Sequence, residues 1–208
     1  MEVIATGDGR TMNFEPGDKI KVDVGSAMRS YTPAQLSSSL LRFVGVLHGQ
    51  GPGSAWLDGL EPGDPVSFFG PARSLRRVEG ALDWAAFVGD ETTIGAAEAL
   101  LGALSPGVKR FGALEVHPES VDAVAARSLG TATLPREERG AAMLRWAEAM
   151  PIPLGEGVVW LSGEASSLVP VKRALLERGL PRRMLRVKPY WSVKGKAHRK
   201  ALERGALR

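Results

Sequence analysis

The chain has 208 residues, of which 44% are hydrophobic and 24% are charged, so it can bury a sizeable core and does not have the composition of a disordered chain. It contains no cysteine, which excludes disulfides, thiolate metal sites, iron–sulfur clusters and a cysteine nucleophile, and its 3 histidines are too few for most histidine-rich metal sites. The sequence has neither a long apolar run nor the features of a signal peptide at its start. We therefore expect a cytoplasmic protein without membrane insertion.

Positive charge is concentrated near the C-terminal end. The whole chain carries a net charge of +4, but the stretch from Lys172 to Arg208 has 13 basic and 2 acidic residues, which gives +11 there and −7 elsewhere. Such asymmetry indicates either an anionic partner or a solvated helix and tail. Only Tyr190 and Trp191 interleave with these charges and no nucleic-acid-binding motif is present, so we do not expect a nucleic acid as the partner.

The first part of the chain, up to about Gly80, has the texture of an all-β structure. Glycine and proline interrupt it every few residues, and short β-prone runs occur at Lys19–Val24, Leu41–Leu47 and Pro65–Gly70. This spacing predicts an antiparallel β-barrel or sandwich.

The pattern changes after Asp83, where apolar strand-like runs alternate with helical segments. This alternation predicts an α/β structure with a parallel sheet. The expected strands are Trp84–Val88, Arg110–Val116, Val158–Ser162 and Arg183–Val187, and the expected helices are Ala96–Leu104, Pro135–Met150, with Pro135 in its first turn, and Leu168–Arg178. We predict two domains, a β domain over residues 1–80 and an α/β domain over residues 81–208 that ends in the basic tail.

The first candidate binding motif lies in the β domain. Arg29, Tyr31 and Thr32 precede Pro33, which favours an extended backbone and places Arg29 and Tyr31 on one face with Thr32 on the other. A guanidinium can hold a phosphate and a phenol ring can stack on a flat heterocycle, although an Arg and a Tyr in a strand are more often ordinary surface and packing residues.

A glycine-rich loop follows, from His48 through Gly49 and Gly53 to Ser54, and leads into a helix that we expect to begin near Ser54. Backbone N–H groups at a helix start form a phosphate cradle, and the Ser54 hydroxyl could serve the backbone or a ligand. A tight turn with Ser54 as the N-cap is the simpler interpretation.

Two loops of the α/β domain are alike. Gly89-Asp90-Glu91-Thr92 and Gly163-Glu164-Ala165-Ser166 each follow a predicted strand and open into a helix, at the strand end where α/β sheets bind ligands. Helix caps with an acidic first turn explain them equally well, and neither is a G-x-G-x-x-G phosphate loop. Lys188-Pro189-Tyr190-Trp191 ends the last strand, where the aromatic pair could cover a flat cofactor or seal the edge of a core.

In this order the motifs resemble those of the siderophore-interacting proteins, a branch of the ferredoxin-reductase-like flavoproteins that reduce ferric siderophores. The resemblance extends over nearly the whole chain. It depends on Arg29-x-Tyr31-Thr32, on His48-Gly49 to Trp56 followed by Pro62-Gly63-Asp64 and Gly70-Pro71, on Gly89-Asp90-Glu91-Thr92, on Gly163-Glu164-Ala165 and on Tyr190-Trp191.

The resemblance implies an FAD-binding antiparallel β-barrel followed by an α/β reductase domain of the NAD(P)H-binding type. The flavin itself would carry the chemistry, so no catalytic side chain is expected. NAD(P)H or reduced ferredoxin would supply electrons, and an anionic ferric siderophore would receive them and release its iron. By this resemblance the FAD-binding residues are Arg29, Tyr31, Thr32, His48, Gly49, Gly53, Ser54, Asp90, Glu91, Thr92 and Trp191; the reductant pocket is Gly163, Glu164 and Ala165; and the substrate-binding residues are Lys188, Lys194 and Lys196.

Four departures from the family pattern are visible. The second arginine that usually follows the threonine is replaced by Pro33-Ala34, and Ile94-Gly95 stands where the family has Leu-Pro. Ser192 replaces a basic residue, whose charge Lys194 or Lys196 could restore. The family's first barrel strand would lie before Met1, so we expect the barrel to lack that strand.

Two alternatives compete with this interpretation. The first is a reductase of the same superfamily with another electron acceptor, which assays with several acceptors would identify. The second is a flavin-free basic binding protein, which a colourless preparation would indicate.

Overall fold

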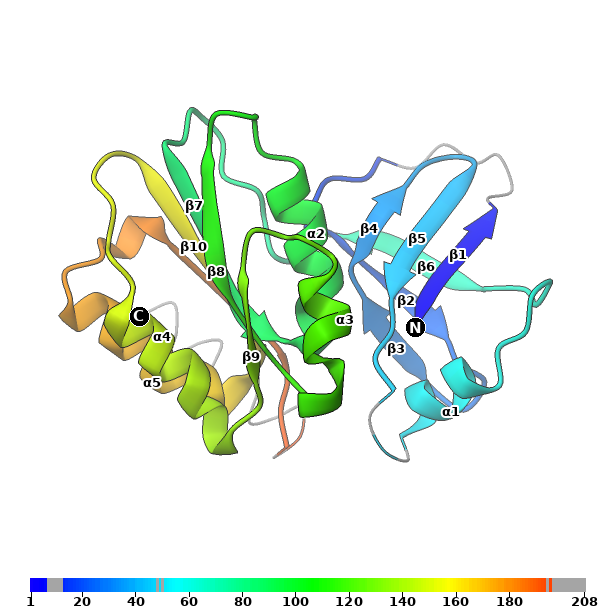
Figure 1. Ribbon diagram of the computed structural model, residues 1–208. Helices are drawn as coiled ribbons and strands as arrows, with labels where there is room; N and C mark the ends of the chain where they lie inside the picture. The colour runs from blue at the N-terminus through cyan, green and yellow to red at the C-terminus, as the bar shows by residue number, and fades with distance from the viewer. Residues whose placement is uncertain (7–12, 48, 50, 194, 196–208) are drawn as a thin grey trace.

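The structure, a computed structural model, describes residues 1–6, 13–47, 49, 51–193 and 195. Its N-terminal β half and its C-terminal α/β half lie side by side (Figure 1). The β half contains β1 (Glu2–Thr6), β2 (Lys19–Asp23), β3 (Met28–Tyr31), β4 (Pro33–Leu36), β5 (Leu40–Val44), α1 (Pro52–Asp58) and β6 (Phe68–Ala72). The α/β half contains β7 (Trp84–Asp90), α2 (Ile94–Gly102), β8 (Lys109–Val116), α3 (Val121–Ala125), β9 (Ala132–Pro135), α4 (Ala141–Ala149), β10 (Gly157–Glu164), α5 (Ala165–Glu177) and β11 (Leu185–Trp191).

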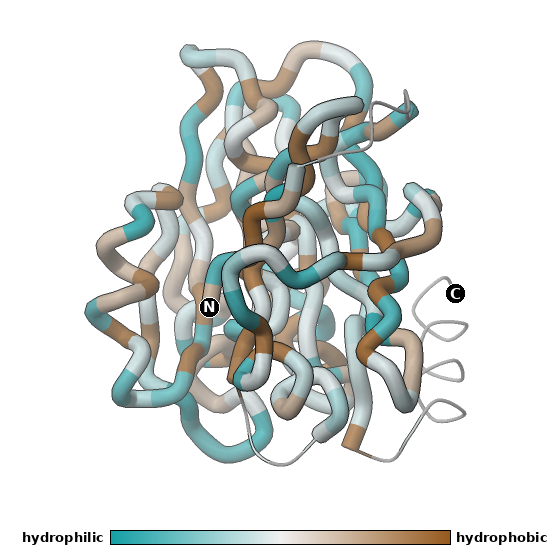
Figure 2. The backbone as a smooth tube through the Cα atoms, turned by 90° about the vertical axis from the view of Figure 1, so that its right-hand side faces the viewer, coloured by the Kyte–Doolittle hydropathy of each residue, from teal (hydrophilic) through white to brown (hydrophobic). Residues whose placement is uncertain are grey.

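The β half consists of two three-stranded antiparallel sheets, with strand orders β1-β5-β4 and β3-β2-β6. Only Thr32 separates β3 from β4, so the chain passes from one sheet to the other at this residue. Figure 2, a view from the side of the β half, shows hydrophobic and hydrophilic residues interleaved along the tube, and buried residues alternate with less buried ones in β2 and β5. In β2, for example, Ile20 and Val22 are buried whereas Lys21 is exposed, which is the pattern of a sheet with one face on a core.

The predicted antiparallel β fold is confirmed, but several strand bounds differ from the expected ones. β5 ends at Val44 rather than Leu47, and β6 begins at Phe68 rather than Pro65. β1 was not predicted. Within the described residues, β1 pairs only with β5 and β6 pairs only with β2.

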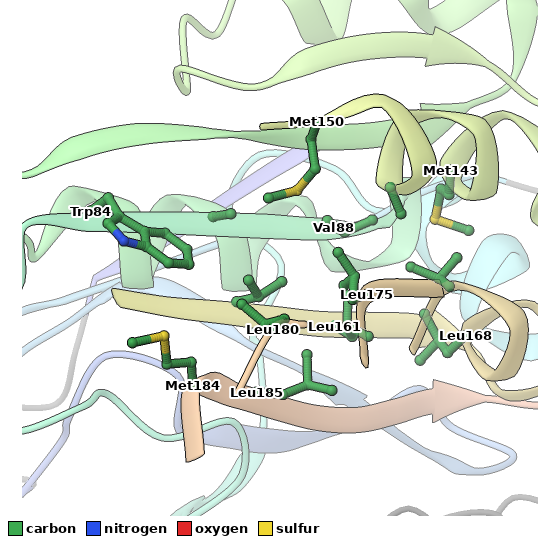
Figure 3. Packing of buried hydrophobic residues seen from close by; sticks show 14 residues of the cluster. Trp84, Val88, Met143, Met150, Leu161, Leu168, Leu175, Leu180, Met184 and Leu185 are labelled. Atoms are coloured by element: carbon green, nitrogen blue, oxygen red, sulfur yellow. The ribbon is translucent and has the colours of Figure 1, made fainter. Parts of the chain in front are cut away.

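The predicted parallel α/β sheet is also confirmed. Its strand order is β11-β10-β7-β8-β9 and every pairing in it is parallel. All residues of β7 and β10 are buried, because helices cover both faces of a parallel sheet. Helices α4 and α5 lie on the outer face, and α2 and α3 lie between the sheet and the β half (Figure 1). Figure 3 shows Val88 and Leu161 of the sheet packing with Met143 and Leu168 of the outer helices.

The helix predicted over 135–150 starts later than expected. Residues up to Pro135 form β9, which pairs in parallel with β8, and α4 begins only at Ala141. Gly140 has a left-handed φ of 74°, which separates the preceding turn from α4. Of the predicted helix, the sheet pairing takes only Pro135, and the turn over Glu138–Gly140 precedes the regular helix. No helix in the described ranges is long and apolar enough to cross a membrane.

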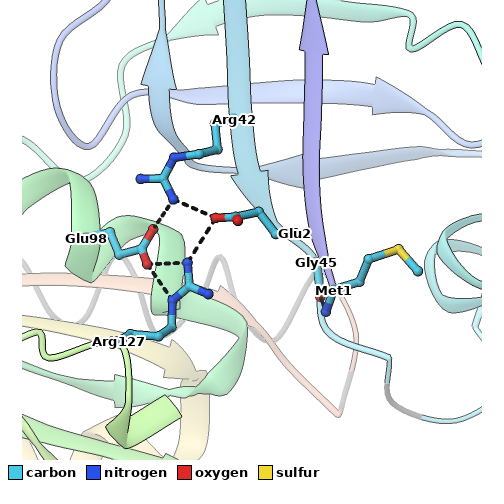
Figure 4. Close-up of polar contacts among 6 residues, drawn as sticks. All are labelled: Met1, Glu2, Arg42, Gly45, Glu98 and Arg127. Carbon is cyan, nitrogen blue, oxygen red and sulfur yellow. Dashed lines mark hydrogen bonds and ion pairs between the residues drawn. The ribbon is translucent and has the colours of Figure 1, made fainter. Parts of the chain in front are cut away.

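A network of alternating charges joins the two halves (Figure 4). Arg42 of β5 donates to Glu2 of β1 at 2.6 Å and to Glu98 of α2 at 3.3 Å. Arg127, which follows α3, donates to Glu98 at 2.5 Å and to Glu2 at 3.2 Å. Both carboxylates pair with both arginines, and the Glu98 side chain is the more buried of the two, at 10% exposed against 37% for Glu2.

Replacing Glu98 with glutamine should lower the free energy of unfolding by about 1–2 kcal/mol, because Arg42 and Arg127 then share only the Glu2 carboxylate in a partly buried contact. Chemical denaturation at low and high salt checks this, and the loss should shrink when salt screens the repulsion. Glu177→Gln is the matched control, since Glu177 forms an exposed i,i+4 pair with Arg173 and its replacement should cost less than about 0.5 kcal/mol. Equal losses in the two variants would show that the network does not couple the halves.

Candidate functional site

Two motifs that are separate in the sequence meet in the β half. Arg29 and Tyr31 of β3 lie on the same side of the strand, and Gly53 of α1 lies directly against them. A Cβ atom added at Gly53 would lie 3.3 Å from the Tyr31 hydroxyl oxygen and 3.4 Å from Cγ of Arg29. The backbone at the start of α1 therefore approaches both side chains closely, and a larger residue at Gly53 would crowd them.

Packing fixes the orientation of Tyr31. Its ring packs on Phe43, with the ring centroids 4.6 Å apart and the planes inclined by 37°. Burial raises the pKa of Tyr31, although the nearby Arg29 charge lowers it in part. The phenol is therefore neutral near pH 7. Arg29 and Tyr31 together therefore present a cation beside a neutral aromatic ring.

The glycine-rich loop differs from its expected form in one respect. Helix α1 begins at Pro52 and its N-cap is Gly51, so Ser54 lies inside the first turn and is not the cap. Proline suits the first helical position because its missing N–H has no partner there in any case. Ser54 is buried, and Gly49 lies in the loop before the helix. His48 lies outside the described residues.

The two halves touch at the end of the Arg29–Thr32 motif. The Thr32 hydroxyl lies 3.2 Å from the Tyr190 hydroxyl of β11, at hydrogen-bonding distance. A Cβ atom added at Gly95 of α2 would lie 2.5 Å from the Thr32 carbonyl oxygen, so α2 also packs tightly here. Burial raises the pKa of Tyr190 to about 12, which keeps this phenol protonated. The sequence indicated only an aromatic cap at Tyr190, and its contact with Thr32 was not predicted.

Asp90 joins three strand ends of the α/β half. One carboxylate oxygen accepts the Thr92 N–H at 3.0 Å, and the other accepts the Glu164 N–H at 2.8 Å and the Trp191 indole N–H at 2.9 Å. Burial raises the pKa of Asp90, while these hydrogen bonds oppose the rise. A Cβ atom added at Gly163, where φ is +141°, would lie 2.7 Å from the same carboxylate. Only glycine fits that position without strain.

Glu164 caps α5. Its carboxylate accepts the N–H groups of Ser166 at 2.7 Å and Ser167 at 2.9 Å, and its other oxygen accepts the Val193 N–H at 3.3 Å. Burial acts against ionisation, but the hydrogen bond from the Ser166 hydroxyl, together with these N–H groups, outweighs it and leaves the pKa of Glu164 below its usual value. Ala165 is the buried first residue of the helix. The carboxylate of this predicted reductant pocket thus holds the local backbone in place.

Glu91 and Glu115 add two more buried carboxylates near these strand ends. Glu91 forms an ion pair with Arg136, and its second oxygen has no hydrogen-bond partner in the described part of the chain. Glu115 of β8 accepts the Ala142 N–H at 3.1 Å, and burial raises its pKa. The strand ends are therefore rich in negative charge, which the sequence showed only in part.

Of the predicted substrate-binding lysines, only Lys188 lies in the described part of the chain. It belongs to β11, and its backbone carbonyl accepts the Ser162 hydroxyl at 2.8 Å. Lys194 and Lys196 lie outside the described residues. No group of three or more residues with metal-ligand chemistry occurs among the described residues.

The geometry suits binding better than acid–base catalysis. The two tyrosines are neutral, and Asp90 and Glu164 are engaged by hydrogen bonds from their own chain. Such a site can position a bound group that carries its own reactivity.

Known proteins match the α/β half by sequence and both halves by fold. The family model of the siderophore-interacting proteins matches residues 82–194. A siderophore utilization protein from T. fusca has a TM-score of 0.76 at 24% identity, over 94% of this chain and 87% of that chain. The siderophore-interacting protein SipS from Aeromonas hydrophila has a TM-score of 0.75 at 21% identity, over 99% and 90% of the two chains.

The fold is shared more widely. The flavohem-like FAD/NAD-binding domain of nitric oxide dioxygenase from Vibrio cholerae O1 biovar El Tor has a TM-score of 0.69 at 17% identity, over 92% of each chain. No protein of curated function matches by sequence.

Proposed function

Since the chain belongs to the siderophore-interacting protein family, we propose that it is an FAD-dependent reductase that releases iron from ferric siderophores. We assign FAD binding chiefly to residues 1–80 and the reductase role of the NAD(P)H-binding type to residues 81–208. The proposal is supported above all by the contact of Arg29 and Tyr31 with the Gly53 backbone, at the place where the halves meet.

The residues present fit FAD in their chemistry. The Arg29 guanidinium can pair with a phosphate, the backbone at Gly53 can approach it with no side chain of its own in the way, and the neutral Tyr31 ring can stack on a flat heterocycle. Thr32 and Trp191 lie on the two sides of the contact between the halves, and we assign them to the flavin ring. His48, Ser54, Asp90, Glu91 and Thr92 complete the proposed cofactor-binding set.

When bound, FAD accepts an electron pair and passes electrons on singly. One NAD(P)H, oxidised to NAD(P)⁺ with release of a proton, would then reduce two Fe(III) chelates to Fe(II). Reduced ferredoxin would do the same one electron at a time. Gly163, Glu164 and Ala165 are proposed to frame the reductant pocket, with Glu164 fixing the start of α5 through its hydrogen bonds.

The substrate is proposed to be an anionic iron chelate. Hard oxygen donors hold Fe(III) more tightly than Fe(II), so one-electron reduction weakens the complex. Lys188, Lys194 and Lys196 would attract the chelate and raise its rate of encounter.

Reduction of ferric siderophores by the full chain tests this function. The FAD-loaded protein is incubated anaerobically with NADH, NADPH or reduced ferredoxin and a ferric siderophore, and Fe(II) is detected with a ferrous-specific chelator. We expect Fe(II) formation that requires FAD and one of the donors. Rapid reduction of quinones or dyes with no Fe(II) formed would instead identify a reductase with another acceptor.

A further inference from the structure

Three hydroxyl groups gather where the β half meets the α/β half. The Thr32 hydroxyl lies 3.2 Å from the Tyr190 hydroxyl, and the Tyr31 phenol is near enough for its charge, when ionised, to raise the pKa of Tyr190. Tyr31 and Thr32 belong to the binding motif of the β half, whereas Tyr190 comes from β11 of the α/β half. One half therefore places a hydroxyl group directly on the motif of the other.

A β-bulge aims Tyr190 at the β half. Strand β11 pairs with β10 residue by residue as far as Pro189 with Gly163, and the next pair is Trp191 with Glu164. Tyr190 is thus the extra residue of the bulge. Bulges re-aim a side chain and are common next to functional sites. Here the bulge brings the phenol oxygen within hydrogen-bonding distance of the β half.

The Thr32 backbone is held in place around this contact. Thr32 is only 5% exposed, and Pro33 restricts its backbone to extended conformations. A Cβ atom added at Gly95 of α2 would lie 2.5 Å from the Thr32 carbonyl oxygen, so the helix leaves the backbone no room to shift. The hydroxyl proton of Thr32, by contrast, can rotate to suit its partners.

The contact with Tyr190 restricts that rotation. A hydrogen bond from the Thr32 backbone N–H also acts on the Tyr190 oxygen, so this oxygen already accepts one bond from Thr32. A phenol loses its proton more readily than an aliphatic alcohol does and is the stronger donor. The Tyr190 proton is therefore best placed on the Thr32 hydroxyl oxygen, and the Thr32 proton then points away from Tyr190.

Tyr190 keeps the proton that this arrangement needs. Burial is the largest cause that raises the pKa of Tyr190, to about 12, and the hydrogen bonds with Thr32 oppose the rise only in part. The negative charges of Asp90 and of an ionised Tyr31 raise the pKa of Tyr190 further, because they would repel its phenolate. The phenol is therefore a hydrogen-bond donor throughout the neutral pH range.

We propose that Tyr190 is a positioning residue, whose phenol donates to the Thr32 hydroxyl oxygen and so turns the Thr32 proton toward the group bound between the halves. The inference rests on the proposed function, in which Thr32 faces the flavin ring. Thr32 is then a hydrogen-bond donor to FAD. The α/β half, through Tyr190, sets the direction of this donor although Thr32 itself belongs to the β half.

FAD titration of the full chain, followed by visible absorbance, tests this role. Thr32→Val should weaken FAD binding about threefold to tenfold, which corresponds to the loss of one neutral hydrogen bond. Tyr190→Phe removes only a hydroxyl and should weaken binding about twofold to fivefold. Both variants should shift the visible absorption maximum of bound FAD in the same direction. In the Thr32→Val background, Tyr190→Phe should cause no further loss of affinity.

Two further variants separate positioning from general support of the fold. Thr32→Ser keeps the hydroxyl, so it should bind FAD as the wild type does and should remain sensitive to Tyr190→Phe. Ser162→Ala is the matched control, because it also removes a hydroxyl bonded to β11, in this case one that donates to the Lys188 carbonyl oxygen at 2.8 Å. It should leave the affinity for FAD and its spectrum unchanged.

Additive losses of affinity in the double variant, or an unchanged absorption maximum in Tyr190→Phe, would show that Tyr190 supports only the fold and would overturn the proposal. These results presuppose a wild type that binds FAD, so they refute the role of Tyr190 alone. A wild type that binds no FAD would instead refute the proposed function, and the role of Tyr190 with it.

Discussion

Replacing Arg29 with alanine is expected to release most of the bound FAD. Arg29 is the cation that lies beside Tyr31 and the Gly53 backbone, and a charge-assisted contact with a phosphate contributes about 1.5–3 kcal/mol. Its loss should weaken FAD binding by about 10-fold to 150-fold. Visible absorbance of the purified variant, before and after titration with FAD, measures the change.

Lys21→Ala is the control for this substitution. Lys21 lies on the neighbouring strand β2, in register with Ser30, and is exposed. Removing it changes the net charge by the same amount, so it should leave FAD affinity unaltered. If Arg29→Ala binds FAD as tightly as Lys21→Ala does, Arg29 is not part of the cofactor site.

The second large effect is expected for Asp90→Ala. This substitution leaves the N–H groups of Thr92, Glu164 and Trp191 without their acceptor in a buried place. Each unsatisfied buried donor costs about 1–3 kcal/mol, and partial relaxation reduces the sum, so we expect a loss of about 3–5 kcal/mol in the free energy of unfolding. Thermal and chemical denaturation measure this loss.

Two variants sharpen this test. Asp122→Ala removes an exposed carboxylate at the start of α3 and should change stability by less than about 1 kcal/mol. Asp90→Asn keeps one acceptor oxygen and should lose less stability than Asp90→Ala. A small loss in Asp90→Ala, equal to that in Asp122→Ala, would contradict the structural role of Asp90.

The same residue predicts a pH dependence. Burial is the main cause that raises the pKa of Asp90 above the usual value of an aspartate. The folded state therefore holds this proton more tightly than the unfolded state does. The contribution of Asp90 to stability should fall as pH rises from about 4 through the raised pKa, and Asp90→Asn should lack this fall.

The sequence predicted the fold class well because its signals are strong and local. Residues Trp84–Val88 of β7 and Val158–Leu161 of β10 are continuous apolar runs, and glycine and proline mark the turns of the β half. The sequence did not predict elements that depend on pairing with a distant segment. Residues 132–135 form the strand β9 because they pair in parallel with β8, and nothing in their own sequence indicates this pairing.

For the candidate site, the sequence supplied the residue types but not their neighbours. Alternation along a strand indicated that Arg29 and Tyr31 share a face, yet the approach of Gly53 and the contact between Thr32 and Tyr190 depend on distant segments. The simpler interpretation of the acidic loops, as helix caps, is what the hydrogen bonds of Asp90 and Glu164 show. Their proposed part in binding cofactor and reductant stays a prediction.

A cationic groove between β11, α5 and the segment that links β6 to β7 was also beyond the sequence. The charge of the segment after Lys172 indicated either an anionic partner or a solvated helix and tail, but Arg76 comes from a loop almost one hundred positions earlier and joins the groove only in the folded chain. Charge density along a sequence can point to such a site, whereas its shape depends on the packing of β11, α5 and the linking segment.

Every proposed role depends on FAD being held where the two halves of the chain meet. The visible absorption spectrum of the full chain, after incubation with FAD and removal of the unbound cofactor, measures this binding. We expect flavin absorbance that stays with the protein at one FAD per chain. A folded, full-length protein that emerges colourless would contradict it.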